Sequence, residues 1–269
     1  LVGSEMCIRD SFKYGGMPFT LELNSQQKID YLKEFMAKLQ SLDRSKDKVT
    51  IFKDFLTLCT CSLAQSIYRS EKLEQRYLET VKQYTKEQAE EFSKLLALLV
   101  MVLEEKYQDF LGEVHMSLNL SSKANGRYFT PYPVCKFMAE INFFEVENSG
   151  KLQDKELITL SEPCCGSGAM IIAFAETMRK HNFNYQNQLY VEAIDINDLC
   201  FMMTYIQLSL LGIPAKVVLG DTLSLKFQQV LYTPFYYLSG VYSKLKQIKQ
   251  EEFKLKPVTN TQLKLFEAR

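Results

Sequence analysis

The residues best suited to chemistry gather around a short glycine-containing segment near the middle of the chain. Positions 162–168 read Glu-Pro-Cys-Cys-Gly-Ser-Gly, and two further acids, Asp195 and Asp221, each follow a short apolar run. Glycines let the backbone approach a ligand closely and begin a helix there. A carboxylate can accept hydrogen bonds from both hydroxyls of a ribose, and an acid before the glycines suits a ligand with an amino group.

The same pattern argues against phosphate binding, because it contains neither a GxGxxG sequence nor a Walker lysine. Together, the three acids and the glycines favour an S-adenosylmethionine site over a dinucleotide site. A lone Gly-Ser-Gly is also typical of a plain turn, so the two later acids carry much of this interpretation.

The elements around these residues must bring the acids together. Apolar runs at 157–160, 190–194 and 215–219 are expected to be strands, and 169–175 and 198–211 are expected to be helices. This strand–helix order predicts an α/β fold with a parallel sheet. Ligands of such sheets lie beyond the carboxyl ends of the strands, where all three acids fall.

The first half of the chain is expected to be all-helical. No Pro or Gly occurs between Ser25 and Gly112. Thr85 followed by Gln88 predicts a capping box that opens a long helix, and Gly112 is expected to end that helix. Apolar residues recur at helical spacing in four stretches, 29–39, 51–63, 73–81 and 92–103. We predict a helical domain over 12–118 that has no chemistry of its own.

Composition excludes several other classes of protein. The 269 residues are 46% hydrophobic, and 32 basic residues balance 32 acidic ones, so any contact with DNA would have to come from a local patch. The seven cysteines form no CxxC pair, which indicates reduced thiols in a cytoplasmic protein and no metal site. The longest apolar run, 95–103, is too short to cross a membrane.

Residues 1–11 resemble a translated sequencing adaptor, and we expect a non-native tail there.

Four segments resemble the adenine-N6 DNA methyltransferase family, in the class of type I restriction-system modification subunits. Positions 162–168 resemble its motif I, and 126–131, Gly-Arg-Tyr-Phe-Thr-Pro, resemble its motif X, preceded by a lead-in at 109–112. The segments 193–197 and 220–223 are similar to the acid motifs at the second and third strands. The resemblance covers roughly residues 25–235.

This resemblance implies a Rossmann-like S-adenosylmethionine-dependent methyltransferase sheet over 119–242, behind the helical domain and before a basic tail at 243–269. It implies DNA as a partner, S-adenosylmethionine as the cofactor, no metal, and no membrane association. The implied cofactor-binding residues are Phe129, Thr130 and Pro131 at the methionine end, Glu162, Gly166 and Gly168 at the amino acid portion, Asp195 at the ribose, and Asp221 at the adenine. Pro131 can instead simply begin a helix, and Asp221 can be a turn residue.

The sequence departs from the family at the catalytic motif. Members carry Asn/Asp-Pro-Pro-Phe/Tyr after the fourth strand, where it holds the flipped adenine, and the nearest segment here is Thr233-Pro234-Phe235. A few mobile-element homologues share a Thr-Pro pair at this place. The stretch after Tyr236 is short for the remaining strands, so the sheet can be incomplete. Three readings stay open: a DNA adenine-N6 methyltransferase, a catalytically silent cofactor-binding or partner subunit, and a methyltransferase for RNA or protein glutamine.

Overall fold

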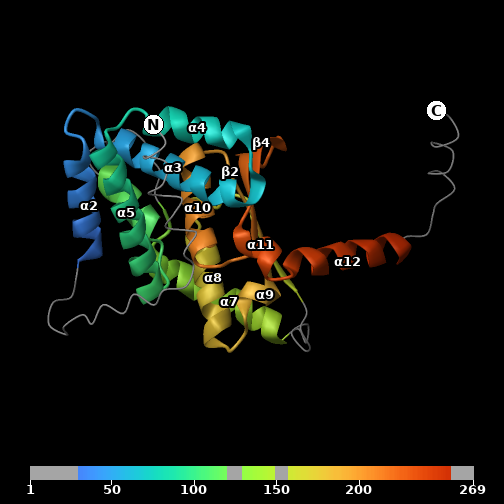
Figure 1. Cartoon of the computed structure of the whole chain (residues 1–269). Helices are drawn as coiled ribbons and strands as arrows, with labels where there is room; N and C mark the ends of the chain where they lie inside the picture. The colour runs from blue at the N-terminus through green and yellow to red at the C-terminus, as the bar shows by residue number, and fades with distance from the viewer. Residues whose placement is uncertain (1–29, 120–128, 149–156, 256–269) are drawn as a thin grey trace, which may run out of the picture.

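The computed structural model describes residues 30–119, 129–148 and 157–255. The expected tail at 1–11, the first three positions of the motif X segment and the end of the basic tail lie outside these residues. Helices make up the first described range (Figure 1). They are α2 (Tyr31–Leu42), α3 (Lys48–Tyr68), α4 (Glu71–Val81), α5 (Lys86–Glu105) and α6 (Phe110–Asn119).

Local capping explains where these helices begin. The predicted capping box is confirmed at the start of α5: the Gln88 amide donates to Thr85 Oγ1 at 3.3 Å, and the Thr85 amide donates to Gln88 Oε1 at 2.9 Å. The prediction that Gly112 ends this helix is wrong. Helix α5 ends at Glu105, Lys106 is extended, and a new helix begins at Phe110 with Gly112 in its first turn. Asp109 starts that helix by accepting a hydrogen bond from the Gly112 amide at 3.1 Å.

The α/β prediction is confirmed. Strands β1 (Ile158–Glu162), β2 (Leu189–Asp195) and β3 (Ala215–Asp221) pair in parallel in the order β1-β2-β3. Helices α8 (Ala169–Lys180) and α10 (Asp198–Leu210) follow the first two strands, and the short helix α9 (Tyr185–Gln188) leads into β2. Parallel pairing brings the carboxyl ends of the three strands to one edge.

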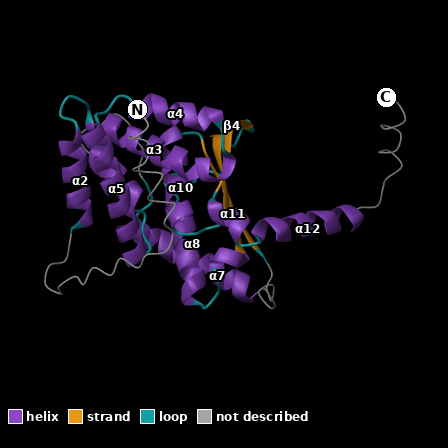
Figure 2. Ribbon diagram, viewed as in Figure 1, coloured by secondary structure: helices purple, strands orange, loops and turns teal. Residues whose placement is uncertain are grey.

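The fourth strand differs from expectation. Strand β4 (Lys226–Tyr232) is antiparallel to β3 and forms a hairpin with it, so it runs back from the carboxyl edge to the opposite end of the sheet. The two outer strands of the sheet are β1 and β4, and among the described residues each pairs with one neighbour only, β1 with β2 and β4 with β3. The segment after β4 is helix α11 (Pro234–Leu238), and α12 (Val241–Leu255) leaves the body of the molecule (Figures 1 and 2).

Helix α7 (Tyr132–Asn148) packs along α8, with Phe143 against Phe174 at a ring distance of 5.9 Å. Its other face carries five apolar side chains that are 43% to 67% exposed, and we call this face the α7 ridge. The α7 ridge consists of Val134, Phe137, Met138, Ile141 and Phe144. Apolar side chains of a soluble domain are seldom gathered in this way without a partner surface.

One hydrophobic core runs through both halves of the chain. Phe35 of α2 packs on Phe110 at 5.4 Å, and the same core takes in Val191 of β2 and Val217 of β3. The expected division at 118/119 falls at the end of α6, inside this continuous core. A second, small cluster, Tyr190 with Tyr236 and Val241, covers part of the opposite face of the sheet.

Candidate functional site at the carboxyl edge of the sheet

The glycine loop, residues 163–168, connects β1 to α8. Gly166 and Gly168 have φ values of +56° and +94°, a region that side chains disfavour, so both positions favour glycine. The Gly168 amide donates to the Cys165 carbonyl at 2.9 Å, and α8 starts at the next residue. The backbone N–H groups at a helix start can bind a carboxylate or another polar acceptor.

Asp195, at the end of β2, reaches this loop directly. Its Oδ2 accepts a hydrogen bond from the Gly166 amide at 2.9 Å, and its Oδ1 accepts one from the Asn197 amide at 2.8 Å. A carboxylate has about four acceptor sites, so sites remain for two hydroxyl groups of a ligand. The structure therefore brings together the two features of the sequence that favoured a nucleoside site.

Glu162 ends β1 and is half-buried beside the loop. Burial raises the pKa of its carboxyl above the ordinary value of 4.5, against a smaller opposing effect of a hydrogen bond from the Cys164 backbone. A carboxylate in such a place is stabilised by a cation. The position suits the ammonium group of an amino acid ligand.

Asp221, at the end of β3, lies on the same edge, but its carboxylate accepts hydrogen bonds within the turn between β3 and β4. Its Oδ1 accepts from the Leu223 amide at 2.9 Å. Hydrogen bonds from Ser224 and Leu223 hold the pKa of this carboxyl below its usual range. Thr222 donates to the Pro163 carbonyl at 2.6 Å and so ties the hairpin to the glycine loop. The alternative role of Asp221 as a turn residue thus has direct geometric support.

The second half of the motif X segment meets the glycine loop from the other side. A side chain added at Gly166 would lie 3.1 Å from the Phe129 ring, which therefore packs directly on the loop. The Pro131 carbonyl accepts from the Val134 and Cys135 amides, so Pro131 also begins α7. Phe129, Thr130 and Pro131 line a cavity of about 710 Å³ together with Asp109, Gly112 and Lys136.

The structure places Thr233, Pro234 and Phe235, the expected catalytic segment, at the opposite end of the sheet from the three acids. Because β4 is antiparallel, Thr233 lies at the amino end of β3. Its hydroxyl accepts from the Ala215 amide at 2.9 Å and donates to the Ile213 carbonyl at 2.7 Å, and the residue is fully buried. Phe235 packs against Gly212, also at that end. Through these two hydrogen bonds, Thr233 joins the start of β3 to α11.

Sequence reasoning missed two polar residues of α10 that hold the loop. Thr204 donates to the Gly166 carbonyl at 2.8 Å, and Gln207 donates to the Ser167 carbonyl at 2.8 Å. Both residues are fully buried. The sequence did contain a sign of these contacts: a glutamine inside an apolar helix must find hydrogen-bond partners when it is buried.

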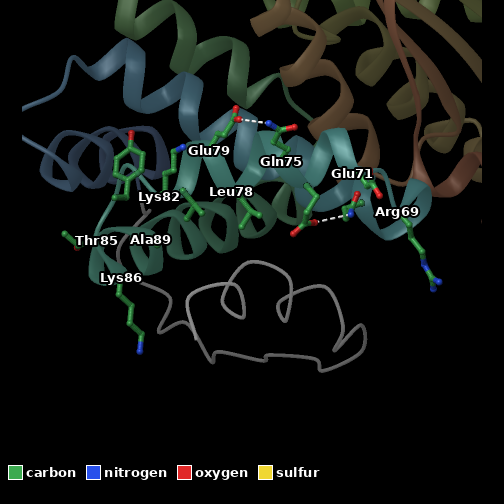
Figure 3. A pocket seen from close by; sticks show the side chains of 13 residues that line it. Arg69, Glu71, Gln75, Leu78, Glu79, Lys82, Thr85, Lys86 and Ala89 are labelled. Atoms are coloured by element: carbon green, nitrogen blue, oxygen red, sulfur yellow. Dashed lines mark hydrogen bonds between the residues drawn. The ribbon is translucent and has the colours of Figure 1, made fainter. Parts of the chain in front are cut away.

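A larger cavity, of about 930 Å³, lies elsewhere, between α4 and the adjoining ends of α3 and α5 (Figure 3). Its polar side chains bond to one another: Gln75 donates to Glu79 at 2.9 Å and Gln65 to Glu74 at 3.1 Å. None of the predicted site residues lines it. Across the described ranges, no group of three or more His, Cys, Asp or Glu residues is arranged to hold a metal ion.

Comparison with known proteins decides the family. The model of the family described as N-6 DNA Methylase matches residues 103–264, which include the glycine loop and all three strand-end acids. The chain belongs to this family. This family match confirms the resemblance to adenine-N6 DNA methyltransferases that the motif segments indicated. Among curated proteins, no relative matches the chain.

Solved structures similar to this chain share little sequence with it. A type I restriction-modification methyltransferase subunit from Streptococcus thermophilus is 16% identical, with a TM-score of 0.37 over 68% of this chain and 55% of its own. A Type ISP restriction-modification enzyme, LlaBIII bound to DNA, is 17% identical, with a TM-score of 0.38 over 91% and 19%. The chain thus spans about half the length of the Streptococcus protein. No helix in the described part of the chain combines the length and apolar composition needed to span a membrane.

Proposed function

We propose that the chain is the S-adenosylmethionine-binding part of a DNA adenine-N6 methyltransferase of the restriction-modification type. The observation that carries this proposal is the 2.9 Å hydrogen bond between Asp195 and the Gly166 amide, which puts an acid for the ribose beside the loop for the amino acid portion. Membership of the N-6 DNA Methylase family supports the choice of DNA adenine as the substrate.

In this proposal the residues of the edge have distinct roles. Asp195 accepts the ribose hydroxyls, Glu162 binds the ammonium group, and Gly166 and Gly168 allow the backbone to approach the ligand. Phe129, Thr130 and Pro131 close the methionine end from the cavity side, and Asp221 lies where the adenine amine would come. When bound, S-adenosylmethionine would supply a methyl group that is activated by the positive sulfur. The residues of this chain would orient that group, and orientation contributes much of the rate of such a transfer.

Calorimetric titration of S-adenosylmethionine into the purified chain tests the proposal. The matched pair is Asp195→Asn and Asp47→Asn, since Asp47 also accepts two backbone amides, at the start of α3, which is not one of the elements that form the edge. We expect saturable binding that Asp195→Asn weakens about 10-fold or more, given the energy of hydrogen bonds to a charged group, and that Asp47→Asn leaves unchanged. A folded wild-type chain that binds nothing would overturn the proposal.

A second candidate is that the chain binds the cofactor but needs a partner subunit for catalysis. Three observations favour it. Thr233 lies at the end of the sheet opposite the glycine loop. No described strand pairs with the outer side of β1, and the apolar side chains of the α7 ridge are exposed. A strand edge and an apolar surface of this kind suit pairing with another polypeptide.

Transfer of a labelled methyl group separates these candidates. The chain is incubated with labelled S-adenosylmethionine and mixed-sequence DNA, RNA or protein, with and without the product of the adjacent gene. Label in DNA with the chain alone supports the first candidate. Label only when the second protein is added supports a partner subunit, and label in RNA or protein alone would reject DNA as the substrate.

A further inference from the structure

A carboxylate that these roles leave unused lies against the glycine loop, where it is partly exposed and lines the same cavity as Phe129, Thr130 and Pro131. Asp109 precedes α6 and caps it through the Gly112 amide at 3.1 Å. The second oxygen of the same carboxylate accepts a hydrogen bond from the Ser167 hydroxyl, inside the loop. Ser167 is itself only 1% exposed. Asp109 therefore joins the start of α6 to the glycine loop, 58 positions further along the chain.

Gln207 of α10 closes the network from a third element. Its Nε2 donates to Asp109 Oδ1 at 2.9 Å and to the Ser167 carbonyl at 2.8 Å, and its Oε1 accepts from the Leu111 amide at 3.1 Å. Both N–H groups and the carbonyl of this side chain are thus in use. A connected network of this kind, which is partly buried, restricts the relative position of the segments that it joins.

The contact between Gly112, Asp109 and Ser167 is close enough to require a glycine at position 112. A side chain added at Gly112 would lie 2.6 Å from Asp109 Cγ and from Ser167 Oγ, closer than atoms can pack. The carboxylate also lies near the starts of α6 and α8, where the helix dipoles favour negative charge. An acid is costly to bury, and in this place it contacts the loop rather than a counter-ion: none of the ion pairs between described residues includes Asp109.

We propose that Asp109 is the positioning residue of the glycine loop, and that it holds residues 166–168 in the conformation that ligand binding requires. Asp195 holds the backbone of the loop at Gly166, and Asp109 holds the loop through the side chain of the next residue, Ser167. Only the identity of the ligand rests on the function proposed above. The positioning itself rests on the network and is measurable in the ligand-free chain.

The test compares Asp109→Asn and Ser167→Ala with Asp47→Asn, which removes a helix-capping carboxylate of the same kind at a distant place. The first readout is hydrogen exchange of the peptide covering 163–170 in the full chain without ligand. The second is the calorimetric affinity for S-adenosylmethionine. The third is the thermal midpoint, which shows that each variant is folded.

We expect faster exchange in 163–170 for Asp109→Asn and Ser167→Ala only, together with an affinity roughly 10- to 100-fold lower, the cost typical of a small misplacement in a binding site. Unchanged exchange in a folded Asp109→Asn would overturn the inference, as would undiminished affinity. If the wild-type chain binds no S-adenosylmethionine, the proposed function fails, and the exchange data alone decide the role of Asp109. Should Asp109→Asn not fold, Ser167→Ala gives the same comparison from the other partner.

Discussion

Asp109 has a second measurable property, because burial raises the pKa of its carboxyl above the ordinary value of 3.8, in opposition to the hydrogen bonds from Gln207, Ser167 and Gly112. Between the pKa of the unfolded chain and the raised pKa of the folded chain, only the folded form holds the proton. Stability must therefore fall as the pH rises through this window.

We predict that the wild type loses stability relative to Asp109→Asn over that window, by up to about 1.4 kcal/mol per pH unit. Urea unfolding of both proteins at a series of pH values measures the difference. If the free energy of unfolding changes with pH in the same way for both proteins, the Asp109 carboxyl titrates alike in the folded and unfolded chains.

Glu162 should make cofactor binding depend on pH. Its raised pKa means that the carboxylate forms only as the pH rises through that value, and a cationic ligand needs the carboxylate. Affinity for S-adenosylmethionine should rise through this range in the wild type. In Glu162→Gln, which cannot ionise, the affinity should be about 10-fold weaker and should not change with pH. Calorimetry over a series of pH values checks this, and a matching slope in the variant would remove Glu162 from the site.

Thr233 should matter for stability alone. Its hydroxyl bonds Ala215 and Ile213 in a fully buried place, so Thr233→Val should cost about 1–3 kcal/mol by leaving a backbone amide without a partner. Thr233→Ser keeps the hydroxyl and is the control. Affinity for S-adenosylmethionine should stay the same in both. A variant of normal stability that has lost methyl transfer would return Thr233 to a catalytic role.

At the scale of elements, two helix starts offer a matched comparison. Thr85 caps α5 with its side chain, whereas Ser70 begins α4 without a side-chain cap bond. Thr85→Ala should therefore lower the free energy of unfolding by about 1 kcal/mol, and Ser70→Ala should leave it nearly unchanged. Denaturant unfolding measures both. Equal losses would show that the capping box contributes nothing specific.

The same elements show which features a sequence can predict. The start of α5 and the strand–helix pairs β1–α8 and β2–α10 follow from residues that are neighbours in sequence, and they were predicted. The end of α5 was not predicted. Gly112 is typical of a helix stop, but a glycine is present there because the backbone of α6 comes close to Ser167, and local sequence patterns do not contain that contact. The direction of β4 was not predicted either. A strand pattern is the same for parallel and antiparallel pairing, and the choice depends on the turn at 222–225.

The candidate site was predicted in the same uneven way. The strand-end acids and the glycines are short motifs on predictable elements, so their meeting at one edge followed from the topology. Asp109, Thr204 and Gln207 act through contacts between distant segments. For Thr204 and Gln207, the one sign in the sequence was a polar residue within an apolar helix. Asp109 lies just before α6, in the segment that resembles the lead-in to motif X.

At the scale of the whole molecule, the helical first half supports the site half. Arg76 of α4 binds Asp198 at the start of α10 at 3.2 Å, and the Tyr232 amide donates to the Tyr68 hydroxyl at 2.5 Å. These contacts accompany a core that is continuous between the halves. The strand-end residue Asp195 lies only three positions before Asp198, so the helical half helps to place it.

We therefore predict that the chain unfolds as one cooperative unit. Scanning calorimetry should give a single transition whose calorimetric and van't Hoff enthalpies agree. Phe110→Ala, at the junction of α6 with the shared core, should lower the stability of the whole transition by about 3–5 kcal/mol. Two separate transitions, with only one of them moved by this substitution, would show that the halves are independent domains.

The distribution of the thiols gives the glycine loop a built-in attachment point for a probe. Among the six described cysteines only Cys164 is exposed, and it lies within the loop; the other five are buried. With Cys7 replaced by serine, a maleimide fluorophore should couple to this one place in the native protein. Its emission would then report the arrival of a ligand at the loop in real time, in a chain that has no tryptophan of its own to serve as an intrinsic reporter.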